Sequence, residues 1–167
     1  LETVVTRANL DLVVHDATVR EILKQVKERG DAALLEYTSR FDQYDLPVEE
    51  IKVTSGEIDE ARNKVDGKEI DALRRAAESI REFHERQIQQ SWEYKKNGVL
   101  LGQSIRPLET AGIYVPGGKA FYPSSVLMNA IPAKVAGVGK VVMCSPASKG
   151  KYSPHVLVAA EIAGVDS

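Results

Sequence analysis

Residues 112–125 read Gly-Ile-Tyr-Val-Pro-Gly-Gly-Lys-Ala-Phe-Tyr-Pro-Ser-Ser, so an apolar segment meets a glycine pair and then a helix start. The segment from Ala111 to Val115 predicts a short strand, which ends at Pro116 because proline cannot donate to a hydrogen-bond ladder. A glycine pair after a strand, here Gly117-Gly118, lets the backbone turn with positive φ and approach a ligand closely. A helix that begins near Ser124 or Ser125 adds free N–H groups and a positive dipole end, which suit phosphate. The run therefore predicts a strand, an anion-accepting turn and a helix.

Downstream of this loop, strands and helices continue to alternate. A helix is expected to run to Val135, and the apolar run in Lys140 to Ser145 suits a parallel strand covered on both faces. A last helix is expected from Ser153-Pro154, with the serine as cap, to about Gly164. This order predicts an α/β fold with an incomplete βαβα parallel sheet. Because Asp166-Ser167 stand where another strand should start, we expect the sheet to be truncated at the C-terminus of this sequence.

Upstream, the apolar spacing is helical. We expect a first helix that starts at Asp16 or Thr18 and stops at Gly30, with a second helix following from Asp31. A short extended piece is predicted at 51–53, before a helix that starts at Ser55.

The longest predicted helix runs from Lys68 to Tyr94. Its apolar stripe has spacings of three and four residues and consists of Ile70, Leu73, Ala77, Ile80, Phe83 or His84, Ile88 and Trp92. A long helix with one apolar stripe often packs across another subunit, so dimerisation through it is a hypothesis. The composition changes after Asn97-Gly98, which predicts a mainly helical region at 1–97 and the start of an α/β domain at 98–167.

Composition excludes several classes of function. The chain has 24 acidic and 22 basic residues, so it lacks the basic surface of a nucleic-acid-binding protein. No apolar run is long enough for a membrane span. Cys144, the only cysteine, excludes an internal disulfide and is expected to be a small hydrophobe in a buried strand. The first residues lack the pattern of a secretory signal, so cytoplasmic residence is expected.

The loop at 116–125 has two readings from its residues alone. It matches neither G-x-G-x-x-G nor G-x-x-x-x-G-K-[ST], the two standard phosphate-binding patterns. It could be an anion site to which Lys119 contributes, or a rigid turn in which Pro116 and Pro123 hold φ.

The residues of this segment also resemble those of a known protein family. Gly112 to Gly118, followed by Tyr122 to Val138, closely resembles the histidinol dehydrogenase family, and the agreement extends upstream to segments that include 30–34, 41–42, 83–84 and 106–108. The resemblance implies a zinc-dependent enzyme that oxidises L-histidinol to L-histidine through the aldehyde in two NAD-linked steps. It also implies a homodimer with incomplete Rossmann-like domains.

The resemblance assigns few site residues to this chain. It implies NAD contact by Tyr114, and we expect Pro116, Gly117 and Gly118 to belong to the same cofactor site. Tyr114 filling the top of the sheet is the structural alternative. No catalytic residue and no zinc ligand is predicted here, because the family's zinc ligands and its Glu-His pair would lie beyond position 167.

The three histidines of the chain are expected to have other roles. His84 is expected to pack beside the apolar stripe, while His155 is expected to be exposed in the first turn of the last helix. His15 is far from both in sequence. Two further functions remain open: an anion-binding α/β module without redox chemistry, and a helical oligomerisation arm without a ligand.

Overall fold

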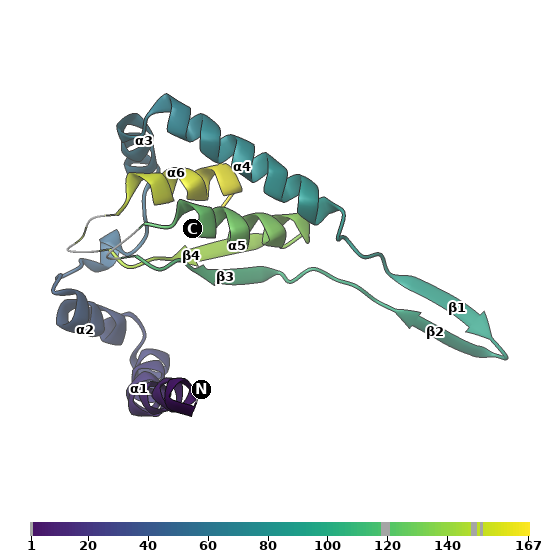
Figure 1. The fold of residues 1–167 in the computed structure, drawn as a ribbon, viewed down its shortest axis with the longest axis horizontal. Helices are drawn as coiled ribbons and strands as arrows, with labels where there is room; N and C mark the ends of the chain where they lie inside the picture. The colour runs from purple at the N-terminus through teal and green to yellow at the C-terminus, as the bar shows by residue number, and fades with distance from the viewer. Residues whose placement is uncertain (1, 118–120, 148–149, 151) are drawn as a thin grey trace. The chain divides into compact units, whose positions relative to one another are not determined.

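The computed structural model of the chain describes the backbone of residues 2–117, 121–147, 150 and 152–167, with side chains from residue 15 onward. It contains two compact units, Leu1–Ile51 and Lys52–Ser167, each of which is described by itself (Figure 1). The compact units divide between Ile51 and Lys52. The domain boundary predicted at 97/98 stays a prediction.

The first unit holds two helices, α1 (Glu2–Arg29) and α2 (Asp31–Asp42), and a short 3-10 turn (Val48–Glu50). The predicted stop at Gly30 is confirmed, because this residue has a φ of 59°, which L side chains rarely adopt. Although α1 has 28 residues, no helix over the described residues is long and apolar enough to cross a bilayer.

Two predictions for this part of the chain are wrong. Neither Asp16 nor Thr18 starts a helix, because α1 runs through both, and the Asp16 carboxylate instead accepts a hydrogen bond from Arg20 one turn on, at 2.6 Å. No strand forms at 51–53, where the chain passes from the 3-10 turn to the next helix.

The second unit begins with two helices that each have a reciprocal N-terminal cap. α3 (Ser55–Lys64) follows Thr54, whose Oγ1 accepts a hydrogen bond from Glu57 N at 3.3 Å while Thr54 N donates to the Glu57 carboxylate at 2.8 Å. α4 (Gly67–Glu85) follows Asp66, which forms the same arrangement with Glu69. These caps satisfy N–H groups that a helix start leaves free, and the predicted starts at Ser55 and near residue 68 are confirmed.

The prediction that the longest helix continues to Tyr94 is wrong. α4 ends at Glu85, and an antiparallel hairpin follows, made of β1 (Trp92–Lys96) and β2 (Val99–Gln103). Its turn, Asn97-Gly98, has φ values of 52° and 81°, as a two-residue hairpin turn with positive φ requires. Ile88 and Trp92 fitted the helical spacing by coincidence.

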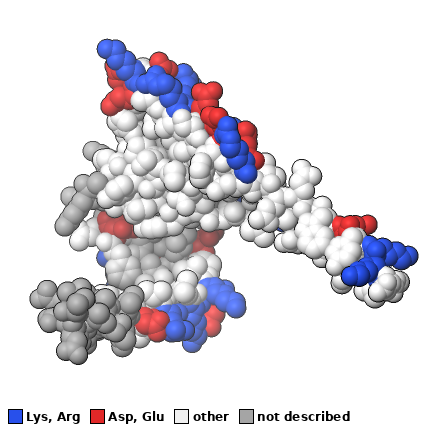
Figure 2. Space-filling view, turned by 45° about the vertical axis from the view of Figure 1, so that its right-hand side comes forward, with Lys and Arg blue, Asp and Glu red and all other residues white. Residues whose placement is uncertain are grey.

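The apolar stripe of α4 is used within the unit. Leu73, Ala77 and Ile80 pack in the core formed with α5 and α6, so this stripe is not free for a second subunit. Acidic and basic side chains alternate along the outer side of α4 (Figure 2), where Arg74 pairs with Asp71 and Arg86 with Glu82.

The parallel sheet predicted from the glycine-containing loop is confirmed. β3 (Thr110–Tyr114) leads through α5 (Pro123–Val135) to β4 (Lys140–Cys144), and the two strands pair in parallel. α6 (Pro154–Ala163) follows, and it ends at Gly164, which has a φ of 77°. α5 lies on the sheet, with α4 and α6 packed against α5 (Figure 1).

The core lies between this sheet and the helices. Its largest fully buried side chains come from α5, the two strand regions and α6, and they are Leu127, Ile131, Val115, Val126, Val141 and Val158. An ion pair joins α3 to α6 beside this core, because the Arg62 guanidinium donates to both carboxylate oxygens of Glu161. These hydrogen bonds hold the pKa of Arg62 above its usual value.

Only one face of the sheet is covered over the described residues. Val141 is fully buried under α5, but Lys140 and Cys144 are exposed and Val142 is half-buried. The expectation that this strand is covered on both faces is therefore wrong for this chain, as is the expectation that Cys144 is buried.

The free edge of β4 pairs with the last residues of the chain, where another strand was expected to start. Asp166 N donates to Val141 O at 2.9 Å, and Met143 N donates to Ser167 O at 2.7 Å. The Asp166 carboxylate also accepts hydrogen bonds from Lys134 Nζ and Val141 N, both at 2.6 Å. The hydrogen bond from Lys134, together with that from Val141 N, lowers the pKa of Asp166.

This arrangement predicts a dependence of stability on pH. A carboxylate with a lowered folded-state pKa stabilises the fold above its unfolded-state pKa, about 4, and loses that effect as the pH falls through the folded-state value. Urea unfolding should therefore show a loss of stability in Asp166→Asn that is largest near pH 7 and vanishes in strong acid. Asp71→Asn, which removes an exposed ion pair 3.4 Å long, is the matched control and should change little at any pH. A deficit in Asp166→Asn that stayed constant down to pH 2 would contradict the assignment.

Candidate functional site

The carboxyl ends of β3 and β4 lie at the edge of the sheet where α5 and α6 begin (Figure 1). Ligands of open α/β sheets bind outside the carboxyl ends of the strands, since loops and helix N-termini converge there. The residues available at this edge come from 114–117, 121–124, 144–147 and 152–155.

Tyr114 is the last residue of β3, and its side chain stands on the open face of the sheet. It is 65% exposed, so the described residues do not bury it in the top of the sheet. Its register partner in β4 is Cys144, which is also exposed, and partners in adjacent strands point to the same face. An aromatic ring and a thiol therefore stand side by side on this face.

The loop after Tyr114 is shaped by contact with the loop after β4. Val115 N donates to Cys144 O at 2.9 Å, which extends the pairing one residue beyond the strand. Two residues past each strand end comes a proline, Pro116 or Pro146, and proline has no N–H to continue the ladder. Beyond this point the loops meet by packing.

Gly117 has a different role from the one predicted. The expectation of a positive φ is wrong for it, since it is not among the described residues with positive φ. Its lack of a side chain instead allows close packing, because a Cβ would stand 3.0 Å from the carbonyl oxygen of Pro146 and 3.2 Å from Pro146 Cγ. Gly118 and Lys119, which were also predicted to act here, lie outside the described residues.

The N-terminus of α5 lies beside this loop. The helix begins at Pro123, one or two residues before the predicted start, and its N-cap residue Tyr122 makes no side-chain cap hydrogen bond. Tyr122 O accepts hydrogen bonds from Ser125 N at 3.0 Å and Val126 N at 3.4 Å. The positive end of the α5 dipole therefore lies at the same edge as Tyr114.

The N-terminus of α6 differs from its prediction in one respect. Ser153 occupies the predicted cap position, but its side chain makes no cap hydrogen bond, and its buried Oγ has no partner. Its carbonyl oxygen instead accepts hydrogen bonds from Val156 N and Leu157 N, at 3.1 and 3.2 Å.

The three histidines do not converge on one point. His155 is half-buried rather than exposed, because its Nε2 lies 3.2 Å from the Glu69 carboxylate of α4. His84 Nδ1 lies 2.7 Å from Gln87 Oε1, and its ring meets that of Phe83 edge to face. His15 is exposed on α1. Over the described part of the chain, no three His, Cys, Asp or Glu side chains are grouped as a metal site would require.

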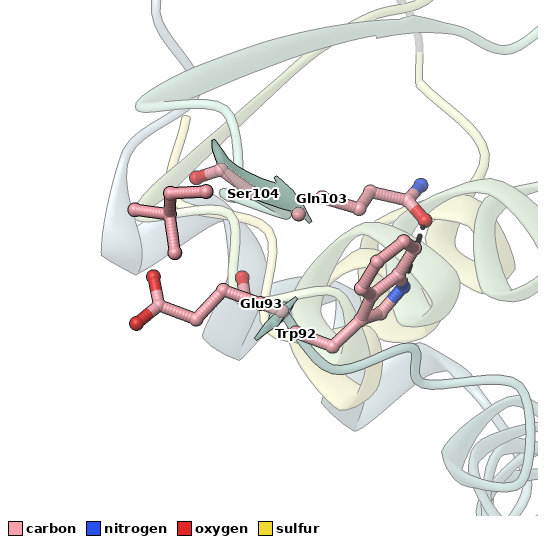
Figure 3. Close-up of a pocket in the computed structure, with 7 residues that line it drawn as sticks. Trp92, Glu93, Gln103 and Ser104 are labelled. Atoms are coloured by element: carbon pink, nitrogen blue, oxygen red, sulfur yellow. Dashed lines mark hydrogen bonds between the residues drawn. The ribbon is translucent and has the colours of Figure 1, made fainter. Parts of the chain in front are cut away.

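An open pocket of about 490 Å³ lies on the hairpin, away from the sheet edge (Figure 3). Trp92 Nε1 donates to Gln103 Oε1 at 3.2 Å across the two strands beside it. Glu93 is the one ionisable residue in its lining, which offers no partner for acid–base chemistry. The sheet edge therefore remains the better candidate site.

Pro146 was not among the site residues predicted from the sequence, and Cys144 lies in the predicted strand but is exposed rather than buried. A signal for Pro146 was present, since Ser145-Pro146 follows the second strand as Val115-Pro116 follows the first. The close approach of Pro146 to Gly117 could be recognised only once the register of the two strands was known.

Comparison with known proteins gives consistent matches. The family profile described as histidinol dehydrogenase matches residues 5–167. Histidinol dehydrogenase from Syntrophotalea carbinolica is 55% identical over 152 residues, which are 90% of this chain and 35% of the relative. That from a Synechococcus species is 46% identical over 169 residues, which cover 99% of this chain and 39% of the relative.

A solved structure agrees with these sequences. The crystal structure of histidinol dehydrogenase from Elizabethkingia anophelis matches with a TM-score of 0.84 and 34% identity, over 92% of this chain and 35% of that one. The chain thus spans little more than a third of the length of these relatives. By its sequence over residues 5–167, the chain belongs to the histidinol dehydrogenase family.

Proposed function

We propose that this chain is the N-terminal part of an NAD-dependent, zinc-requiring histidinol dehydrogenase, which oxidises L-histidinol to L-histidine through the aldehyde in the last steps of histidine biosynthesis. The observation that carries the proposal is the exposed Tyr114 at the carboxyl end of a parallel strand, within the residues that match the family. The non-redox module and the oligomerisation arm have no comparable support.

The geometry at the sheet edge fits one side of a dinucleotide site. The ring of Tyr114 is free to pack against a flat ligand while its hydroxyl forms a hydrogen bond. The N-terminus of α5 adds a positive dipole end for a phosphate. NAD, when bound, supplies the acceptor for the hydride that leaves the alcohol and then the aldehyde. The residues of this chain would bind and orient it.

The same residues do not fit zinc. Zinc requires three or four His, Cys, Asp or Glu ligands at one point, and the described residues bring no such group together. We therefore place the zinc ligands and the acid–base residues in the part of the relatives that this chain does not span. No catalytic step is assigned to residues 1–167.

Activity of the full-length protein tests the proposal directly. We expect NADH to form when L-histidinol and NAD are added to the zinc-loaded protein, and removal of zinc by a chelator to stop it. The 167-residue chain under the same conditions should form no NADH. A full-length protein without this activity would contradict the proposal, and an active 167-residue chain would contradict the placement of the catalytic groups.

Tyr114→Ala tests the cofactor contact in the full-length protein. If the ring packs against NAD, the variant should lose about 1 to 2 kcal/mol of binding, or roughly five- to thirtyfold in the dissociation constant. Tyr114→Phe keeps the ring and should retain most of the affinity. Phe41→Ala removes a half-exposed aromatic ring from α2, which is part of neither the proposed cofactor site nor the hairpin, and is the matched control. An unchanged NAD affinity in Tyr114→Ala would assign Tyr114 to packing.

We also propose that the full-length enzyme is a cytoplasmic homodimer. The α4 stripe is occupied within its own unit, so a dimer must use other surfaces, and the hairpin exposes Trp92, Tyr94, Val99 and Leu101. Light scattering at micromolar concentration should give twice the subunit mass. A monomer mass would refute the dimer.

A further inference from the structure

The loops that follow β3 and β4 pack closely against each other at one point. Gly117 and Pro146 approach so closely that a Cβ on Gly117 would meet the Pro146 carbonyl oxygen at 3.0 Å, Cγ at 3.2 Å and Cδ at 3.6 Å. A Cβ at 3.0 to 3.4 Å from its neighbours is tighter than ordinary van der Waals contact, so the loops would have to separate by a few tenths of an ångström.

The residues around this contact restrain the positions of both loops. The backbone hydrogen bond from Val115 N to Cys144 O, 2.9 Å long, holds the two segments together just before the loops touch. Val115 is itself fully buried in the core. Pro116 and Pro146 restrict φ on both sides, which leaves the loops little freedom to change course. The position of Gly117 therefore follows from that of Pro146.

We infer that Pro146 is a positioning residue for cofactor binding, which holds the loop from Tyr114 to Gly117 in place through its contact with Gly117. This inference rests on the proposed function, since the loop positioned is the one that carries Tyr114. It assigns Gly117 a packing role against the second loop, in place of the direct approach to a ligand that the sequence suggested. Pro146 itself need not touch the cofactor.

A double-mutant cycle in the full-length protein tests the inference. Gly117→Ala pushes the loops apart and should weaken NAD binding about tenfold, with KM for NAD rising and kcat changing less than about twofold. Pro146→Ala adds no atom, removes the Cγ and Cδ contacts, and should weaken binding by about two- to threefold. Pro146→Ala removes the Cγ contact and also frees φ at residue 146, so that the carbonyl oxygen at 3.0 Å can move away from the new Cβ. The double variant should therefore bind NAD better than the product of the two effects.

A second readout does not depend on the cofactor. Hydrogen exchange at the Val115 amide reports the bond to Cys144 O, and it should accelerate in Gly117→Ala and slow again in the double variant. Gly67→Ala is the matched control, because a Cβ at Gly67 meets nothing within 4 Å. This readout also remains for Pro146→Ala if Gly117→Ala does not fold.

The outcomes separate the inference from the proposed function. If the unaltered protein fails to bind NAD, the proposed function is lost, while the exchange data still decide whether Pro146 positions Gly117. If the unaltered protein binds NAD but the two substitutions act additively, or Gly117→Ala matches Gly67→Ala in both readouts, the inference is overturned.

Discussion

Burial of one face of the β3–β4 sheet under α5 is the constraint on which the second unit depends. Two parallel strands expose too much backbone and apolar surface to be stable in water alone, so a helix must cover them. Val141 and Val115 are fully buried at this junction, and Leu127 and Ile131 of α5 are buried over them. Because α4 and α6 pack on α5, they are held to the sheet indirectly. α3 packs on α6 in turn, where Arg62 donates hydrogen bonds to Glu161.

The same layer determines where a ligand can bind. Parallel strands place their carboxyl ends together, and each helix that returns the chain brings its N-terminus back to that edge. At this edge the hydrogen-bond ladder stops at Val115 and Cys144, because each strand is followed by proline. The loops then remain together by the contact of Gly117 with Pro146, and Tyr114 stands just before that contact with its ring exposed. The shape of the site is thus a consequence of how the ladder ends.

Many of the helix ends were predictable from capping, proline and glycine residues in the sequence. Gly30, Ser55, Pro154 and Gly164 mark helix ends as predicted, because caps and glycine turns act through neighbouring residues alone. α5 begins at Pro123, one or two residues before its predicted start. The first strand of the hairpin, β1, was missed because Ile88 and Trp92 continue a helical stripe by spacing, although Asn97-Gly98 is a strong hairpin signal. Tyr114 was located by its motif. The role of Pro146 was not, since a contact between two loops depends on register, which local spacing does not encode.

The match to the solved structure covers most of this chain but only about a third of the relative. The Elizabethkingia anophelis structure shares this fold over 35% of its own chain, and nearly two thirds of that polypeptide lies outside the match. The contact between Gly117 and Pro146 lies wholly within this chain, because both partners are among the described residues and follow directly on the paired strands. A TM-score of 0.84 at 34% identity indicates that this backbone is kept when most side chains differ. The paired strands and the contact between Gly117 and Pro146 therefore shape this edge of the sheet within the chain itself.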